Sequence, residues 1–177
     1  MNNPISSPYQ RFSLLILGFV LVLGLLIGWI FLQSQSQSDT GESNGFFAGS
    51  APENLGLTQE QLAPCPSTPN CVVSQNADAS HQIAPIFYTG DRDQARERLL
   101  KVLSVVPRTS ILVSNKDYIR AESRSRIFGF VDDLEFYLPV NQSQIEVRSS
   151  SRLGESDLGV NRRRLEQIRL AMQDLEP

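Results

Sequence analysis

The sequence predicts an α+β fold in which an N-terminal transmembrane helix precedes a two-layer domain. In that domain two helices pack on a four-stranded, mainly antiparallel sheet, in the order α-β-β-β-β-α. Three observations support this: an uncharged apolar run, two later segments with apolar side chains at helical spacing, and a stretch between them that alternates polar and apolar residues. We therefore expect a cytoplasmic N-terminus (1–11), a transmembrane helix (12–32), a flexible linker (33–63) and a soluble domain (64–177).

The charge balance argues against nucleic-acid binding. The chain of 177 residues has a formal net charge of −3, but from Pro64 onward 15 Lys and Arg residues balance 15 Asp and Glu residues. A neutral domain lacks the basic patch with which proteins bind DNA or RNA. Two cysteines and one histidine are also too few for a four-ligand zinc site, so we expect no metal and no cofactor.

The apolar run at residues 12–32, FSLLILGFVLVLGLLIGWIFL, has the length of about 20 residues that a membrane-spanning helix needs. A cleaved signal peptide is the alternative, but its apolar part is usually only about 7–15 residues long. Arg11 precedes the run and the next cation is Arg92, so the positive-inside rule places the domain across the membrane from the cytoplasm. Gly24 and Gly28 form a GxxxG motif, which predicts either a weak dimer or ordinary glycine in a membrane helix.

The segment at residues 33–63 is rich in Gln, Ser, Gly and Asn, which is typical of a flexible linker. Within it, Thr58–Gln61 has the form of a helix capping box. Cys65 and Cys71 follow, and outside the cytosol they should form a disulfide. Their spacing is not CxxC, so a structural bond is favoured over a redox-active pair.

The first helix of the domain is expected at residues 91–106. Asp91 is a suitable N-cap, and Pro107 disfavours a helical residue before it. Ala95, Leu99, Leu103 and Val106 form an apolar stripe along it, which Leu100 and Val102 widen. The segment therefore predicts an amphipathic helix that packs on a sheet.

The sheet is expected from residues 111–113, 118–124, 131–140 and 144–150, where the side chains alternate. Hairpins at residues 125–130 and 141–143 would place Arg120 opposite Glu135 and Glu135 beside Arg148. One face should be apolar and covered by the helices, while the other face carries a ladder of alternating charges.

The closing helix is expected at residues 158–175, with Leu165, Ile168, Met172 and Leu175 on its buried side. Its first turn carries three arginines, although the positive end of a helix disfavours cations. Either nearby carboxylates, with Asp157 as the cap, neutralise them, or the region holds a phosphate or carboxylate ligand. The residues of this candidate anion site are Arg148, Ser150, Arg152, Asp157, Arg162, Arg163 and Arg164.

The sequence does not offer a complete catalytic set. Ser150 lacks an identifiable base, because the single histidine, His81, lies in a loop-like stretch and is expected to be solvated. Glu122, Asp133 and Glu135 lie among arginines that would hold them in salt bridges. We therefore expect no catalytic residues, and a small hydrolase that uses these serine or carboxylate side chains is the alternative.

Three segments carry a family resemblance: CPSTPNCVVS at 65–74, YIRAESRSRIFGFVDDLEFYL at 118–138 and IEVRSSSRLGESDLGVNRRRLEQIR at 145–169. Together they resemble the family called domain of unknown function 1499, found in bacteria, cyanobacteria and plastids. The resemblance covers roughly residues 62–175 and implies one domain without an assigned activity or cofactor. With the topology above, the domain would lie in the periplasm or the thylakoid lumen.

The expected function is therefore that of a membrane-tethered binding or assembly module. Its partner is an unknown protein or lipid on the non-cytoplasmic side. Ile127, Phe128 and Phe130 lie at a hairpin tip, where apolar side chains either dock such a partner or pack under the edge of the sheet.

Overall fold

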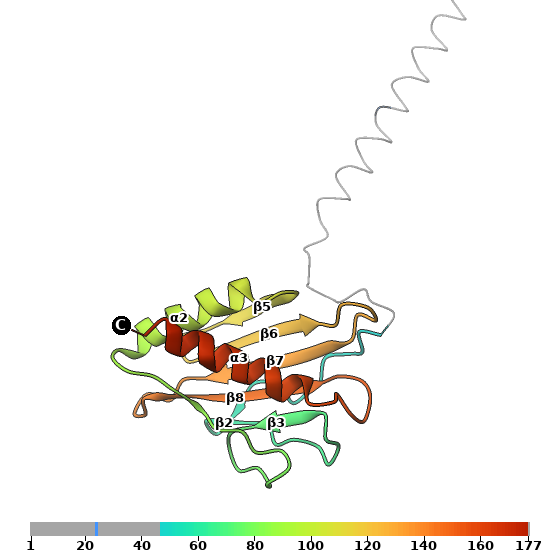
Figure 1. Cartoon of the computed structure of the whole chain (residues 1–177), viewed down its shortest axis with the longest axis horizontal. Coiled ribbons are helices and arrows are strands. Elements are labelled where there is room, and N and C mark those ends of the chain that lie inside the picture. Colours follow the sequence, from blue (N-terminus) through green and yellow to red (C-terminus); the bar gives the residue numbers. More distant parts are fainter. Residues whose placement is uncertain (1–23, 25–46, 177) are drawn as a thin grey trace, which may run out of the picture. The chain divides into compact units, whose positions relative to one another are not determined.

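The computed structural model describes Gly24 and residues 47–176 of the chain (Figure 1). The chain divides into two compact units, of which the second, residues 43–177, contains the sheet and both of its helices. Within the described residues, no helix has the length and apolar character needed to cross a bilayer. The span predicted at residues 12–32 and the second glycine of the predicted dimer motif, Gly28, lie outside the described residues and stay predictions.

A six-stranded antiparallel sheet forms the centre of the domain, in the order β3-β8-β7-β6-β5, with β4 also paired to β8. The strands are β3 (Cys71–Val73), β4 (Ile86–Phe87), β5 (Thr109–Ser114), β6 (Tyr118–Arg124), β7 (Val131–Tyr137) and β8 (Gln144–Ser151). The last four are the strands that the sequence predicts. The predicted number of four was wrong, because β3 and β4, only three and two residues long, also pair with β8.

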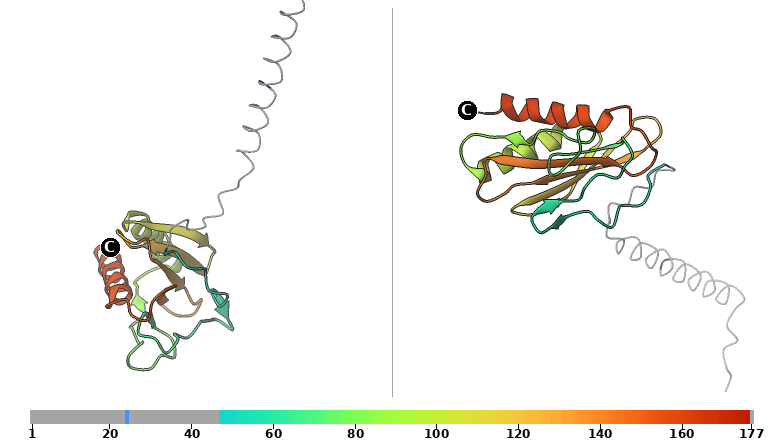
Figure 2. Two further views of the ribbon diagram at one scale, coloured as in Figure 1. Left: turned by 90° about the vertical axis from the view of Figure 1, so that its right-hand side faces the viewer. Right: turned by 90° about the horizontal axis from the view of Figure 1, so that it is seen from below.

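Helices α2 (Arg92–Val105) and α3 (Val160–Asp174) cover one face of the sheet (Figure 2). Asp91 caps α2 as predicted, since its side chain accepts hydrogen bonds from the backbone amides of residues 93 and 94. The core lies between the helices and the sheet, and its largest fully buried side chains include Leu99, Leu103, Leu165, Ile168, Leu134 and Phe136. The prediction that Leu175 is buried was wrong, because α3 ends at Asp174 and Leu175 is exposed.

The opposite face of the sheet carries the predicted ladder of charges. Arg120 pairs in register with Glu135, and Glu135 with Arg148, as the alternation of β6, β7 and β8 predicts. The structure differs in burial: the Asp133 and Glu135 side chains are each 0% exposed, although this face lies away from the helices. A second layer therefore covers the charges.

The cover is a two-stranded ribbon of β1 (Leu57–Thr58) and β2 (Gln61–Leu62). Leu62 packs with Tyr118 and Tyr137 on the charged face, in a small apolar cluster that also contains Val73. The ribbon lies within the stretch expected to be a flexible linker, so the folded domain begins well before residue 64. It lies on the side of the sheet away from α2 and α3 (Figure 2).

The turn of the ribbon replaces the predicted capping box at Thr58–Gln61. Its central residues, Gln59 and Glu60, have φ values of 51° and 61°, the left-handed conformation that a tight two-residue hairpin requires. Gln75 fixes the ribbon from outside by accepting a 2.8 Å hydrogen bond at Oε1 from the amide of Leu62.

A disulfide joins Cys65 to Cys71, which confirms the predicted bond. The bond closes the short loop between the ribbon and β3. This loop holds Asn70, whose buried backbone oxygen accepts a 3.0 Å hydrogen bond from the amide of Ser151 at the end of β8. The disulfide therefore fixes the loop to which the end of β8 is hydrogen-bonded.

Candidate functional site

The predicted anion-site residues are divided between two sides of the sheet. Asp132 and Asp133 are neighbours on β7, so their side chains point to opposite faces. Arg152 pairs with Asp133 on the face away from the helices, whereas Arg164 of α3 pairs with Asp132 on the helix side. The two sets of side chains therefore form separate clusters, and the single common site that we predicted does not form.

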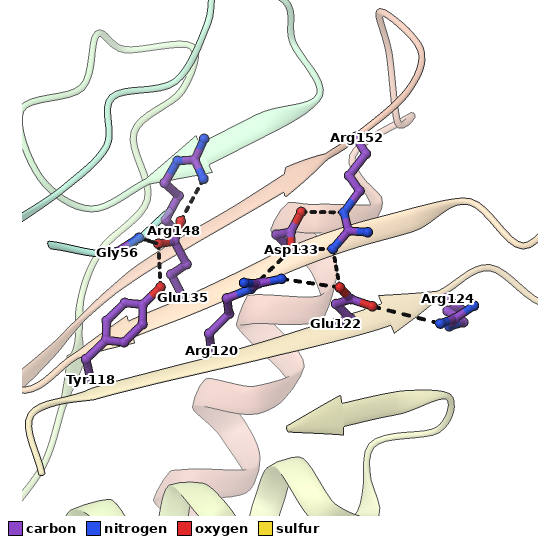
Figure 3. Close-up of polar contacts among 9 residues, drawn as sticks. All are labelled: Gly56, Tyr118, Arg120, Glu122, Arg124, Asp133, Glu135, Arg148 and Arg152. Carbon is purple, nitrogen blue, oxygen red and sulfur yellow. Dashed lines mark hydrogen bonds and ion pairs between the residues drawn. The ribbon is translucent and has the colours of Figure 1, made fainter. Parts of the chain in front are cut away.

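We call the set on the face away from the helices the buried network; it consists of Tyr118, Arg120, Glu122, Arg124, Asp133, Glu135, Arg148 and Arg152 (Figure 3). At one end, Glu135 accepts hydrogen bonds from the Tyr118 hydroxyl at 2.7 Å, from Arg148 Nη1 at 2.7 Å and from the Gly56 amide at 2.8 Å. The last bond comes from the segment just before the ribbon. Glu135 therefore holds the covering layer onto the sheet.

At the other end of the buried network, Arg152 binds two carboxylates. Its Nε lies 2.8 Å from Asp133 Oδ2, its Nη2 lies 2.9 Å from Asp133 Oδ1, and the same Nη2 donates to Glu122. The Asp133 carboxylate is the main reason that the pKa of Arg152 is raised above its ordinary value, with a further contribution from Glu122. Arg120 also contacts Glu122 and Asp133, at 3.4 and 3.5 Å.

The chemistry of the buried network is that of internal charge pairing. Arg148 and Arg152, both predicted to bind an external anion, are neutralised by carboxylates of the protein itself. Burial and the neighbouring Glu135 raise the pKa of the Tyr118 hydroxyl, so it stays protonated at neutral pH. The network therefore supplies neither a free base nor a ready proton donor.

On the helix side, a second set of polar residues surrounds Asn161, which sequence reasoning missed. This helix-side cluster consists of Asn70, Asp132, Ser149, Ser151, Asn161 and Arg164. The Asn161 side chain is fully buried; its Oδ1 accepts from Ser149 Oγ at 2.6 Å and its Nδ2 donates to the Asn70 carbonyl at 3.0 Å. One asparagine therefore connects α3, the end of β8 and the disulfide loop.

The arginines at the start of α3 are bound within the protein. Arg164 Nη2 donates to Asp132 Oδ2 at 2.7 Å, Arg163 Nη1 to the Leu158 carbonyl at 2.8 Å, and Arg162 Nη1 to the Gln82 carbonyl at 2.7 Å. These contacts favour the intramolecular interpretation over a bound anion. The predicted cap differs in detail.

Gly159 is the N-cap residue of α3, in a left-handed conformation with φ of 76°. Two residues earlier, Asp157 still stabilises the helix start, because it accepts hydrogen bonds from the amides of Gly159 and Asn161 at 3.0 and 2.7 Å. Ser150, another residue of the predicted anion site, is buried on the face of the sheet away from the helices, where it pairs in register with Asp133 of β7.

An Arg164→Gln substitution should lower the free energy of unfolding by about 1–3 kcal/mol, because Asp132 loses a charged partner in a largely buried site. Thermal denaturation of the full chain measures this.

Added sulfate should raise the melting temperature of the wild type no more than sodium chloride of equal ionic strength. A sulfate-specific rise would instead indicate an anion site.

We expected His81 to be solvated, but its side chain is buried between two acceptors. Its Nδ1 lies 2.8 Å from Asp78 Oδ2 and its Nε2 lies 3.2 Å from the Thr68 carbonyl oxygen. The hydrogen bond to Asp78 raises the pKa of His81 above its ordinary value of 6.5, with a smaller contribution from Thr68. Both ring nitrogens are therefore engaged, so this histidine does not provide the base that a serine hydrolase needs.

The raised pKa of His81 makes stability depend on pH. Protonated His81 stabilises the fold fully below the ordinary pKa of 6.5, and this contribution is lost as the pH rises through the higher pKa of the folded state. The melting temperature should thus fall between about pH 6 and about pH 9 by more in the wild type than in His81→Gln. Equal slopes in the two proteins would show that the contact with Asp78 does not form.

A cleft opens at one end of the sheet, between the β6–β7 hairpin and the turn that joins β8 to α3. Its inner part, about 170 Å³, has Asp132 and Ser151 on its floor and Phe130, Leu153 and Val160 on its walls. An adjoining outer part of about 410 Å³ is lined by residues that include Ile127, Phe128 and Leu158. We call both parts together the end cleft.

The polar groups on the floor of the end cleft already have partners. Ser151 Oγ donates to Asp132 Oδ1 at 2.5 Å, and Arg164 binds the other oxygen of the same carboxylate. The polar groups at the floor therefore belong to the helix-side cluster, while the walls of the cleft are apolar. Such a cleft suits an apolar group more than an anion.

Three phenylalanines form an aromatic cluster beside the end cleft. The ring centroids of Phe47 and Phe130 are 5.3 Å apart, those of Phe128 and Phe130 5.9 Å, and those of Phe47 and Phe128 6.4 Å. Phe47, the first residue of the continuous described segment, therefore lies at this end of the domain. At the hairpin tip Phe130 is half-buried, while Ile127 and Phe128 are exposed, and the docking of a partner or lipid there stays a prediction.

A family model described as "Protein of unknown function (DUF1499)" matches residues 61–172. The match includes the whole sheet and most of α3, and it begins at the second strand of the ribbon. No curated protein matches the chain. In the described part of the chain, no group of three or more His, Cys, Asp or Glu side chains is placed to hold a metal ion.

Proposed function

Because the chain belongs to the DUF1499 family of proteins of unknown function, we propose its function from its own structure: it is a membrane-tethered binding module on the non-cytoplasmic side. In this proposal residues 12–32 form the transmembrane helix, and the domain binds through the end that carries the end cleft. The observation that carries the proposal is this cleft, with its apolar walls and internally satisfied floor. It lies where the chain enters the domain from the tether.

The disulfide supports the location of the domain. Cys65 and Cys71 form a bond of the kind that persists in oxidising compartments and is rare in the cytosol. A domain placed across the membrane by the single Arg11 before the apolar run would fold in such a compartment. Localisation in the periplasm or the thylakoid lumen follows from the same reasoning.

The side chains of the sheet do not favour the hydrolase alternative. The carboxylates of the buried network are themselves buried and accept hydrogen bonds from arginine, tyrosine and backbone donors, and Glu135 also binds the segment before the ribbon. A substrate would have to displace these partners to reach them. The proposed activity is therefore binding, without a reaction.

Membrane integration and site-specific photo-cross-linking test the proposal. The full chain should stay in the membrane pellet after alkaline extraction, and protease should digest the domain only when it is given access to the non-cytoplasmic side of the membrane. A photo-reactive residue at Ile127, which is 83% exposed beside the cleft, should form adducts in native membranes. The same residue at Val140, 75% exposed in the β7–β8 turn at the opposite end, should not. Extraction into the soluble fraction, or equal adducts at both positions, would contradict the proposal.

A further inference from the structure

Large apolar side chains gather around the mouth of the end cleft. Ile127 is 83% exposed, Leu158 84% and Phe128 59%, and Phe47 and Leu153 are also exposed. We call these five residues the apolar rim. They come from the β6–β7 hairpin, the turn before α3 and the start of the described segment, which lie at one end of the domain (Figure 1). Soluble domains rarely expose such a group of side chains without a binding role.

The tether limits what this end of the domain can reach. Only 14 residues, 33–46, separate the apolar run from Phe47. A flexible chain of that length has a root-mean-square extension of roughly 20 Å. With residues 12–32 in the bilayer, as proposed, a linker of this length would keep Phe47, and with it the apolar rim, within reach of the membrane surface.

We propose that the apolar rim inserts into the outer surface of the lipid bilayer and that the end cleft accepts lipid acyl chains. This inference rests on the proposed tether and names the partner of the same site. The occupant is lipid and not a soluble protein, because a linker of only 14 residues would keep the rim within reach of the bilayer. The rim is made of phenylalanine, leucine and isoleucine, and phenylalanine and leucine are among the side chains that membrane-surface segments bury at the boundary between headgroups and acyl chains.

The charges around the rim indicate whether its insertion into the bilayer requires anionic lipids. Arg126 and Arg163 are exposed near the cleft, but so is Glu155, so this end has no strong positive field. Two carboxylates line the cleft: Arg164 neutralises Asp132, and Asp157 accepts hydrogen bonds from the amides of Gly159 and Asn161 at the start of α3. Insertion therefore depends on apolar contact, and uncharged phosphatidylcholine should support it as well as anionic lipid does.

Quenching of tryptophan fluorescence by brominated lipid tests the proposal in the full chain. Trp29, the only native tryptophan, is first replaced by phenylalanine. One reporter is Phe128→Trp; the other is Phe87→Trp, which replaces a phenylalanine of similar exposure, 62%, in β4. β4 pairs with the first residues of β8, at the end of the sheet away from the cleft. Both proteins are reconstituted into phosphatidylcholine liposomes with brominated acyl chains.

The expected result is strong quenching and a blue shift at position 128, with neither at position 87. An Ile127→Ser/Leu158→Ser double substitution should remove the quenching at position 128, because both side chains are exposed and belong to the rim. A matched Val140→Ser substitution at the opposite end should leave the quenching unchanged. Anionic liposomes should give the same quenching as neutral ones.

Two other outcomes would overturn the inference. Absence of quenching at position 128 in protein that floats with the liposomes would show that the rim does not enter the bilayer, while the tether would stand. Equal quenching at both positions would show that the domain has no preferred orientation on the membrane. Protein that fails to float with the liposomes at all would refute the proposed tether itself, and the two failures are thus distinguishable.

Discussion

Replacing Glu135 by alanine should lower the free energy of unfolding by about 3–5 kcal/mol, because it removes one partner of a buried ion pair. The substitution leaves three donors without their acceptor: the Arg148 guanidinium, the Tyr118 hydroxyl and the Gly56 amide. Unlike a loss of packing alone, it leaves an uncompensated charge inside the protein. Equilibrium urea denaturation followed by circular dichroism measures the change.

Glu97→Ala is the matched control for Glu135→Ala. Glu97 also forms a 2.8 Å ion pair with an arginine, Arg96, but its side chain is 70% exposed. The expected loss of stability for this exposed pair is below about 1 kcal/mol. Glu135→Gln keeps the shape of the side chain and should fall between the two. If Glu135→Ala costs no more than Glu97→Ala, the ribbon does not cover the charged face in solution.

The second large effect is expected for Asn161→Ala, at about 3 kcal/mol. A buried polar group left without its partner costs about 1–3 kcal/mol, and this substitution affects at least Ser149 and the Asn70 carbonyl. Asn141→Ala, in the exposed β7–β8 turn, changes the same residue type and should stay within about 0.5 kcal/mol of the wild type.

The Asn161 substitution should also act at a distance. Because Asn161 connects α3 to the disulfide loop, hydrogen exchange in Asn161→Ala should rise at the amide of Ser151, which donates to Asn70. The same exchange in Asn141→Ala should match the wild type. A uniform rise over the whole domain would instead indicate a general loss of stability and contradict this specific link.

The sequence predicted the parts of the fold in which the pattern is long enough to read. Alternation over the seven residues of β6 and of β7 fixed their inward and outward faces, and with them the pairing of Arg120 with Glu135. Strands of two or three residues, such as β3 and β4, are shorter than one readable repeat. Only their pairing with β8 identifies them.

The burial of the charged face was not predictable from the same alternation. A polar face normally faces water, and the layer that covers it comes from a stretch rich in glutamine and serine. The tight turn of the ribbon also lacks the usual signal, because Gln59 and Glu60 adopt a left-handed conformation that glycine or asparagine normally marks.

The grouping of the arginines into one candidate site was wrong for a related reason. We grouped the arginines because they are close in sequence. Their partners Asp132 and Asp133 are consecutive residues of β7, so they point to opposite faces of the sheet and hold Arg164 and Arg152 apart.

The ribbon that covers the buried network has a consequence for the order in which the protein folds during synthesis. The Gly56 amide and the Glu135 carboxylate are 79 positions apart, so the early part of the chain has to wait for a partner made much later. At a synthesis rate of about 5–20 residues per second, this delay is roughly 4–16 seconds. The disulfide closes over a separation of only six residues and does not have to wait.

The loop at Cys65–Cys71 is therefore expected to close first, before β8 exists to pair with β3. Contacts between distant parts of a chain form slowly, because loop-closure entropy opposes them until the contacts are made. Docking of the ribbon onto the completed sheet is thus the last step of folding. Until that step, the Glu135 end of the buried network remains open to water, so the nascent domain exposes a buried ion pair that the finished protein covers.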